Sequence, residues 1–104
     1  MSEIEELICL IREFANRRDW EKFHTPKNLA MAITREAGEL AAEFQWLSTE
    51  EASNISNLPV ERIELEIADI AIYLLRICDV LKVNFVEVVK RKMEINESRF
   101  PAPK

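Results

Sequence analysis

Helical periodicity runs along almost the entire chain, and this feature restricts the possible folds most strongly. Apolar side chains recur at helical spacing in four segments, and a single glycine, Gly38, occurs in 104 residues. The sequence has no run of alternating apolar and polar residues that would predict a strand. We therefore expect one all-α domain spanning residues 1–104, with its helices in a four-helix arrangement.

Capping signals set the expected ends of the helices. Ser2 with Glu5 has the spacing of a capping box, and Asn84 with Glu87 has the same spacing. Pro26 occupies a first helical position, where its missing N–H is harmless. The expected helices span residues 2–17, 26–47, 59–82 and 84–99, with one short additional turn at 48–51.

The composition narrows the function classes. With a formal net charge of −5, the chain lacks the basic surface that polymeric nucleic acid requires, although a bound metal could still bring a nucleotide to it. No apolar run reaches the ~18 residues of a membrane span, and the acidic N-terminus is unlike a secretory signal. We therefore expect a cytoplasmic protein without membrane contact, in which Cys9 and Cys78 stay reduced.

Two acidic pairs carry the clearest chemical signal. Glu36 and Glu39 are three residues apart in the second expected helix, and Glu66 and Asp69 repeat this spacing in the third. The spacing places both acids on one helix face, along the edge of the apolar stripe. Carboxylates at such a margin are partly desolvated and need a cation or hydrogen-bond donors to stay ionised. Two adjoining helices would then aim all four at one divalent metal ion.

A solvated helix face is the competing interpretation for either pair, because acids are common in this chain. The occurrence of both pairs at the edge of the core, on consecutive helices, favours the metal site. Gly38 lies inside the first pair, where glycine costs about 1 kcal/mol relative to alanine. A neighbour that packs closely against this helix would explain the glycine, and a tight crossing of two helices would suffice.

The third expected helix is apolar on nearly every side. Its main stripe includes Ile63, Ile67 and Ile70, whereas Leu65 and Ile72 fall away from that stripe. A helix that is apolar all round is buried all round, and a bundle of this size cannot easily cover both faces. We expect a second subunit to cover the remainder; the alternative is coverage by other helices of the same chain.

Aromatic residues near the acids could bind a planar base. Trp20, His24 and Asn28 lie close together around the start of the second helix, and this combination suits stacking and hydrogen bonds to a base edge. Trp46 and Tyr73 lie on the helix flanks that carry the acids and could form walls of the same pocket. The alternative is that these side chains pack the end of the bundle, and a single histidine usually has a structural role.

The fourth expected helix carries a polar set at i, i+4 and i+7, namely Lys92, Asn96 and Arg99. Cations at the margin of a core could neutralise phosphate groups. Alternatively, they extend from a helix end towards water, where the helix dipole favours positive charge. The sequence leaves open whether they act in their own or in a neighbouring subunit's pocket.

These residues together resemble the MazG-like nucleotide pyrophosphohydrolases. EAGE at 36–39 and EIAD at 66–69 match the ExxE and ExxD signature of that family. The resemblance to its dCTP pyrophosphatase branch extends over almost the whole chain from the first loop onward. It includes RDWEKFHTPKNL from Arg18, FQW at 44–46, IYL at 72–74 and KMEINESRFP at 92–101.

The resemblance implies a four-helix MazG-like bundle completed by oligomerisation, as a homodimer or as a tetramer built from two dimers. It implies that Mg²⁺, or alternatively Mn²⁺, is bound by the catalytic acids Glu36, Glu39, Glu66 and Asp69. It also implies a set of residues that bind a nucleoside triphosphate: Trp20, His24, Asn28, Trp46, Tyr73, Lys92, Asn96 and Arg99.

The implied reaction is hydrolysis of dCTP or a modified dCTP to the monophosphate and pyrophosphate, which would clean the nucleotide pool. Oxygen-only ligands suit Mg²⁺ or Mn²⁺, and the lack of a Glu-x-x-His motif argues against a di-iron bundle. Glu39 could orient the attacking water. Two alternatives remain, namely a house-cleaning pyrophosphatase of broad specificity and a non-catalytic helical module that oligomerises and binds a partner.

Overall fold

The structure is a computed structural model that describes residues 1–103, and every regular element in that range is a helix. The elements in chain order are α1 (Glu3–Arg17), η1 (Glu21–Phe23), α2 (Pro26–Ala42), α3 (Thr49–Ser53), η2 (Ile55–Asn57), α4 (Val60–Leu81) and α5 (Phe85–Arg99). The prediction of an all-α fold is confirmed. None of the helices over residues 1–103 is long and apolar enough to cross a bilayer.

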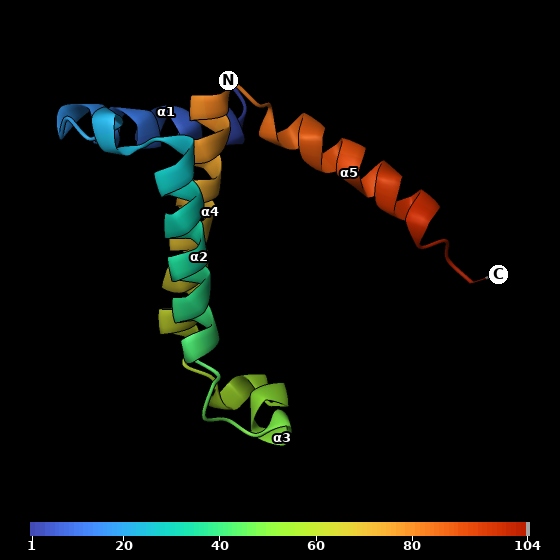
Figure 1. Ribbon diagram of the computed structural model, residues 1–104. Helices are drawn as coiled ribbons and strands as arrows, with labels where there is room; N and C mark the ends of the chain where they lie inside the picture. The colour runs from blue at the N-terminus through green and yellow to red at the C-terminus, as the bar shows by residue number, and fades with distance from the viewer. Residues whose placement is uncertain (104) are drawn as a thin grey trace.

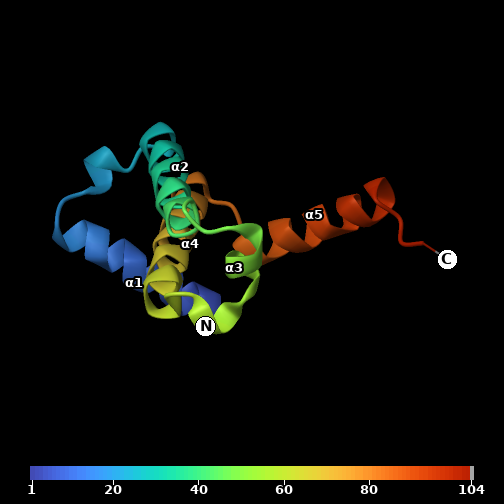
Figure 2. The ribbon, with the colours of Figure 1, turned by 90° about the horizontal axis from the view of Figure 1, so that it is seen from below.

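An antiparallel pair, α2 and α4, forms the centre of the molecule (Figure 1). α1 crosses this pair at the end that holds the start of α2 and the end of α4 (Figures 1 and 2). The buried apolar residues come from these three helices: Ala15, Leu29, Ile63 and Leu75. Burial of a leucine side chain stabilises a fold by about 1.5–3 kcal/mol, so this small core fixes how the three helices cross.

The predicted caps are present. The Ser2 hydroxyl accepts a hydrogen bond from the backbone N–H of Glu5, whose carboxylate accepts one from the Ser2 N–H. Asn84 caps α5 by accepting from the backbone N–H of Glu87. These side chains satisfy donors that helix starts otherwise leave unpaired. The predicted short turn at 48–51 is found as α3.

One predicted boundary is wrong, because α2 ends at Ala42 and not near Leu47. The N–H groups of Glu43 and Phe44 donate to carbonyls three residues back, at 3.2 and 3.0 Å. Such bonds tighten the last turn of a helix into a 3₁₀ form, and the chain then leaves the helix axis. The apolar periodicity continues past this point, and for that reason the sequence pattern overestimated the helix.

The single chain is open, because α3 and α5 project away from the central pair (Figures 1 and 2). Its radius of gyration is 16.8 Å, against about 13 Å for a compact domain of this size. Several large apolar side chains of α4 and α5 are exposed, including Leu65 (66%), Ile67 (53%) and Met93 (56%). The chain thus supplies the helices of a bundle without closing it.

Gly38 is not explained by packing within the chain. A Cβ atom added there would meet nothing within 4 Å among the described residues. The expectation of a close neighbour therefore fails for a single chain, because the helix face at Gly38 is open in residues 1–103.

Candidate active site

The crossing of α2 and α4 brings three of the four predicted acids together. Glu36 and Glu39 come from α2 and Glu66 from α4, and one oxygen from each lies within 4.8 Å of the others. Glu36 is buried, Glu66 is half-buried and Glu39 is exposed. Three carboxylates at this separation offer an oxygen-only ligand set for a hard divalent cation.

The hydrogen bonding of these acids is incomplete. Oε2 of Glu36 and Oε2 of Glu66 are both buried and have no hydrogen-bond partner among residues 1–103. A buried acceptor without a partner costs about 1–3 kcal/mol, and neighbouring carboxylates repel each other as well. A cation between them would remove both costs, so these residues fit a metal site.

Asp69, the fourth predicted acid, lies outside this group of three and lines an adjacent cavity of about 230 Å³. The cavity lies between α1, the loop after it and α4. Three of the residues expected to bind a nucleoside also line it, namely Trp20, His24 and Tyr73. The structure therefore places an aromatic cavity beside the acids, because Asp69 of the cavity lies one turn of α4 after Glu66 of the acid cluster.

The aromatic wall is built by the loop that follows α1. The Trp20 ring meets the rings of Phe14 and His24 edge-on, with centroids 5.6 and 6.1 Å away. The backbone N–H of Trp20 donates to the carbonyl of Ala15, and Asp19 adopts a left-handed φ of 56° to make this turn. The Trp20 side chain is 41% exposed, so part of its ring remains open for stacking.

Arg35 is one residue near the acids that the sequence interpretation missed. Its Nη2 donates to Oε1 of Glu36 at 3.3 Å. This hydrogen bond, followed by the influence of Tyr73, raises the pKa of Arg35. Its side chain is 61% exposed, so the ion pair contributes little to stability and leaves the guanidinium free to move.

The remaining predicted residues lie outside the cavity within one chain. Asn28 donates from Nδ2 to the carbonyl of Phe23 at 3.0 Å, and so stabilises the loop between α1 and α2. Trp46 lies in the turns after α2, with its side chain 88% exposed. Lys92, Asn96 and Arg99 are on α5, which extends away from the central pair (Figure 1).

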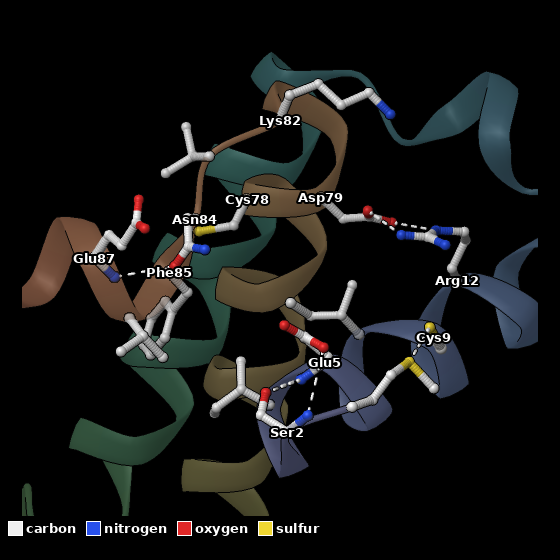
Figure 3. A pocket seen from close by; sticks show the side chains of 15 residues that line it. Ser2, Glu5, Cys9, Arg12, Cys78, Asp79, Lys82, Asn84, Phe85 and Glu87 are labelled. Carbon is white, nitrogen blue, oxygen red and sulfur yellow. Dashed lines mark hydrogen bonds and ion pairs between the residues drawn. The ribbon is translucent and has the colours of Figure 1, made fainter.

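A second polar cluster, which we call the Arg12–Asp79 cluster, was also missed. Arg12 donates to both carboxylate oxygens of Asp79, at 2.8 and 2.6 Å (Figure 3). Buried Arg76 donates to Asp79 at 3.1 Å and to Nδ1 of His24 at 3.0 Å. The hydrogen bond from Arg12 is the main reason that the pKa of Asp79 lies below its usual value, although burial opposes it. The signal was two opposite charges at i, i+3 in the otherwise apolar second half of α4.

A larger hollow, about 600 Å³, lies elsewhere, between α1, the end of α4 and the start of α5 (Figure 3). Both free cysteines, Cys9 and Cys78, line it. None of the predicted site residues does, so the larger volume does not mark the chemistry.

Comparison with a solved structure decides the family. A pyrophosphatase from Archaeoglobus fulgidus is 47% identical, with a TM-score of 0.91 over 98% of this chain and 95% of that one. This chain belongs to the MazG-like pyrophosphatase family. The open arrangement of the helices is therefore shared with this solved pyrophosphatase.

Curated relatives agree with this MazG-like assignment. The dCTP pyrophosphatase 1 proteins of Bos taurus and Homo sapiens are each 42% identical, over 94% and 95% of this chain. The chain spans about 59% of the length of these relatives. No family model matches the chain.

Proposed function

We propose that this protein hydrolyses dCTP or a modified dCTP to the nucleoside monophosphate and pyrophosphate, and so removes unwanted nucleotides from the pool. The observation that carries the proposal is the pair of buried carboxylate oxygens without partners, on Glu36 and Glu66, beside an aromatic cavity. The names of the curated relatives support dCTP as the substrate. Deoxynucleotide pools and two free cysteines both suit a cytoplasmic location.

The metal would be held by Glu36, Glu39 and Glu66, with Asp69 as the remaining acid within one helical turn. Oxygen-only donors favour Mg²⁺, with Mn²⁺ as the alternative. When bound, such a cation neutralises the triphosphate charge, polarises the phosphorus and lowers the pKa of a coordinated water.

The chain's own residues would orient the substrate and move the proton. Glu39 is the exposed member of the acid cluster, so it is the carboxylate best placed to accept a proton from the attacking water. Water attack at the α-phosphorus breaks the bond to the bridging oxygen and releases pyrophosphate. Trp20 and Tyr73 would hold the base in the cavity, beside the acids that face the phosphates.

A second copy of the chain would complete the bundle, as a homodimer or a tetramer of two dimers. The exposed apolar side chains of α4 and α5 support this assembly, because a folded monomer rarely exposes so many at once. Lys92, Asn96 and Arg99 of α5 would then act in a neighbouring subunit's pocket, because α5 points away from its own (Figure 1). Light scattering after gel filtration tests this assembly; a monomer at micromolar concentration would contradict it.

The activity test is a panel of the four canonical dNTPs with Mg²⁺, with both products identified. We expect dCMP and pyrophosphate from dCTP, and loss of turnover after EDTA treatment that added Mg²⁺ restores. Equal rates for all bases would favour a house-cleaning enzyme of broad specificity. Release of orthophosphate would contradict cleavage at the α-phosphorus, and no product from any dNTP would favour a non-catalytic oligomerising module.

A further inference from the structure

His24 is the end point of a continuous series of polar contacts that starts on α1. Arg12 of α1 pairs with Asp79 of α4, Asp79 accepts from Arg76, and Nε of Arg76 donates to Nδ1 of His24. The last contact joins residues that are 52 positions apart in the sequence. The tertiary fold therefore determines the environment of the histidine.

The direction of the Arg76–His24 hydrogen bond fixes the protonation of the imidazole. An arginine side chain has only donors and stays protonated, so Nδ1 of His24 must present its lone pair. The proton of the neutral ring is therefore on Nε2. An imidazolium would place an N–H against the N–H of Arg76, which the contact forbids.

The partners of Arg76 hold it rigidly in this arrangement. Its relative exposure is only 5%, and its Nη1 is held by Asp79, which Arg12 engages with both oxygens. Burial, followed by the charge of Arg76, lowers the pKa of His24. Electrostatics and hydrogen bonding therefore both favour the neutral ring.

The other ring nitrogen is left available. Nε2 of His24 has no hydrogen-bond partner among residues 1–103, and the side chain lines the 230 Å³ cavity together with Trp20 and Tyr73. A neutral N–H donor in an aromatic cavity pairs with an acceptor atom on the edge of a planar ring. The N3 and O2 atoms of cytosine are acceptors of this kind.

We propose that Arg76 is a positioning residue that holds His24 as a neutral imidazole protonated on Nε2, so that it donates a hydrogen bond to the base in the aromatic cavity. The identity of the ligand as a base rests on the proposed function, whereas the tautomer does not. Arg76 also lines the cavity, but in this role it acts through His24, and the Asp79–Arg12 pair supports it from the other side.

NMR of the ¹⁵N-labelled full chain tests the tautomer directly, because His24 is the only histidine. We expect Nδ1 to resonate as an unprotonated nitrogen and Nε2 as a protonated one at pH 7. A ring protonated on Nδ1, or a rapidly averaged mixture of tautomers, would overturn the proposal. This measurement uses the unaltered protein, so it does not depend on the folding of a variant.

The matched variants are Arg76→Met and Arg62→Met. Both remove an arginine of α4 that pairs with a carboxylate, but Arg62 contacts Glu43 and not His24. We expect the first to give averaged His24 nitrogen resonances and the second to leave them as in the unaltered protein. Equal spectra for the two variants would overturn the positioning role.

Kinetics with dCTP then separate this role from the proposed function. Loss of a neutral hydrogen bond remote from the reacting atoms should raise KM roughly 5-fold in Arg76→Met, with kcat nearly unchanged. An unchanged KM would overturn the positioning role while the enzyme assignment stands. If the unaltered protein turns over no dNTP, the proposed function fails, and perturbation of the Nε2 resonance by dCMP decides whether His24 contacts a base.

Discussion

Two charged clusters lie along α4, and they differ in whether their charged groups have partners within the chain. Near its start, Glu66 joins Glu36 and Glu39, which are all negative, and two buried oxygens have no partner. Near its end, the carboxylate of Asp79 accepts from the positively charged side chains of Arg12 and Arg76, so each of these three groups has a partner of opposite charge. The first cluster is incomplete without a ligand, whereas the second is complete within the chain.

This difference separates two reasons for placing charge beside a core. Like charges held together raise the free energy of the folded chain. Such a cluster is therefore expected where binding of a ligand offsets the repulsion. Opposite charges with good hydrogen-bond geometry restrain one another and fix the orientation of whatever they contact. The acid cluster thus indicates binding, and the Arg12–Asp79 cluster indicates positioning.

The largest expected effect comes from Glu36→Gln. Loss of groups that merely orient metal ligands costs about 10–100-fold, so loss of a ligand should cut turnover of dCTP by at least about 100-fold. The metal-free variant should also be more stable by about 1 kcal/mol, because it removes a buried negative charge whose Oε2 has no partner and which lies beside two other carboxylates. Assays of turnover and urea unfolding in EDTA measure the two effects.

Glu64→Gln is the control for this change, because Glu64 is exposed on the same helix as Glu66 and lies outside the cluster. It should behave as the unaltered protein in both assays. If Glu36→Gln also keeps its Mg²⁺ binding and turnover, the acids are surface groups, and the acid cluster no longer indicates a binding site.

Asp79→Asn should give the opposite sign of stability change. It removes the carboxylate that accepts from Arg12 and Arg76, and leaves buried Arg76 with one neutral partner. We expect a loss of about 2 kcal/mol in the free energy of unfolding, measured with urea at fixed protein concentration. Glu43→Gln, which breaks a more exposed pair with Arg62, should cost less than about 1 kcal/mol. Equal losses in the free energy of unfolding would mean that the Arg12–Asp79 cluster stabilises the fold no more than the exposed pair does.

The pH dependence of stability offers a finer comparison. The pKa of His24 is lowered from 6.5 in the folded chain, so the unfolded chain binds more protons just below pH 6.5. Stability should therefore be full above that pH and fall as the pH drops through this window, by less than about 1.4 kcal/mol per pH unit. His24→Asn keeps an acceptor for Arg76 and should abolish the slope. A slope that survives the substitution would assign it to other groups.

The smallest expected effect concerns Gly38, which lies between two residues of the acid cluster. Nothing among residues 1–103 would touch a new Cβ atom, so Gly38→Ala should stabilise α2 by about 0.5–1 kcal/mol. Urea unfolding of the variant tests this. Destabilisation, together with a smaller assembly in light scattering, would instead show that a second copy packs against this face.

Much of the fold followed from local patterns in the sequence. Capping pairs and apolar spacing depend on neighbours within one turn, so the helices and most of their ends could be predicted. The end of α2 could not, because its last carbonyls switch to 3₁₀ bonds where the chain turns toward α3. The acid pairs were predictable for the same local reason, since an i, i+3 spacing fixes a shared face.

The sequence by itself determined which residues share a helix face, and therefore which acids and aromatic side chains could act together. Only the tertiary structure decided that Glu66 joins the acids of α2 while Asp69 faces the cavity with Trp20 and Tyr73. The contact of Arg76 with His24 likewise depends on how the loop after α1 meets α4. Periodicity describes one helix at a time, whereas the angle at which helices cross is set by the packing of distant side chains.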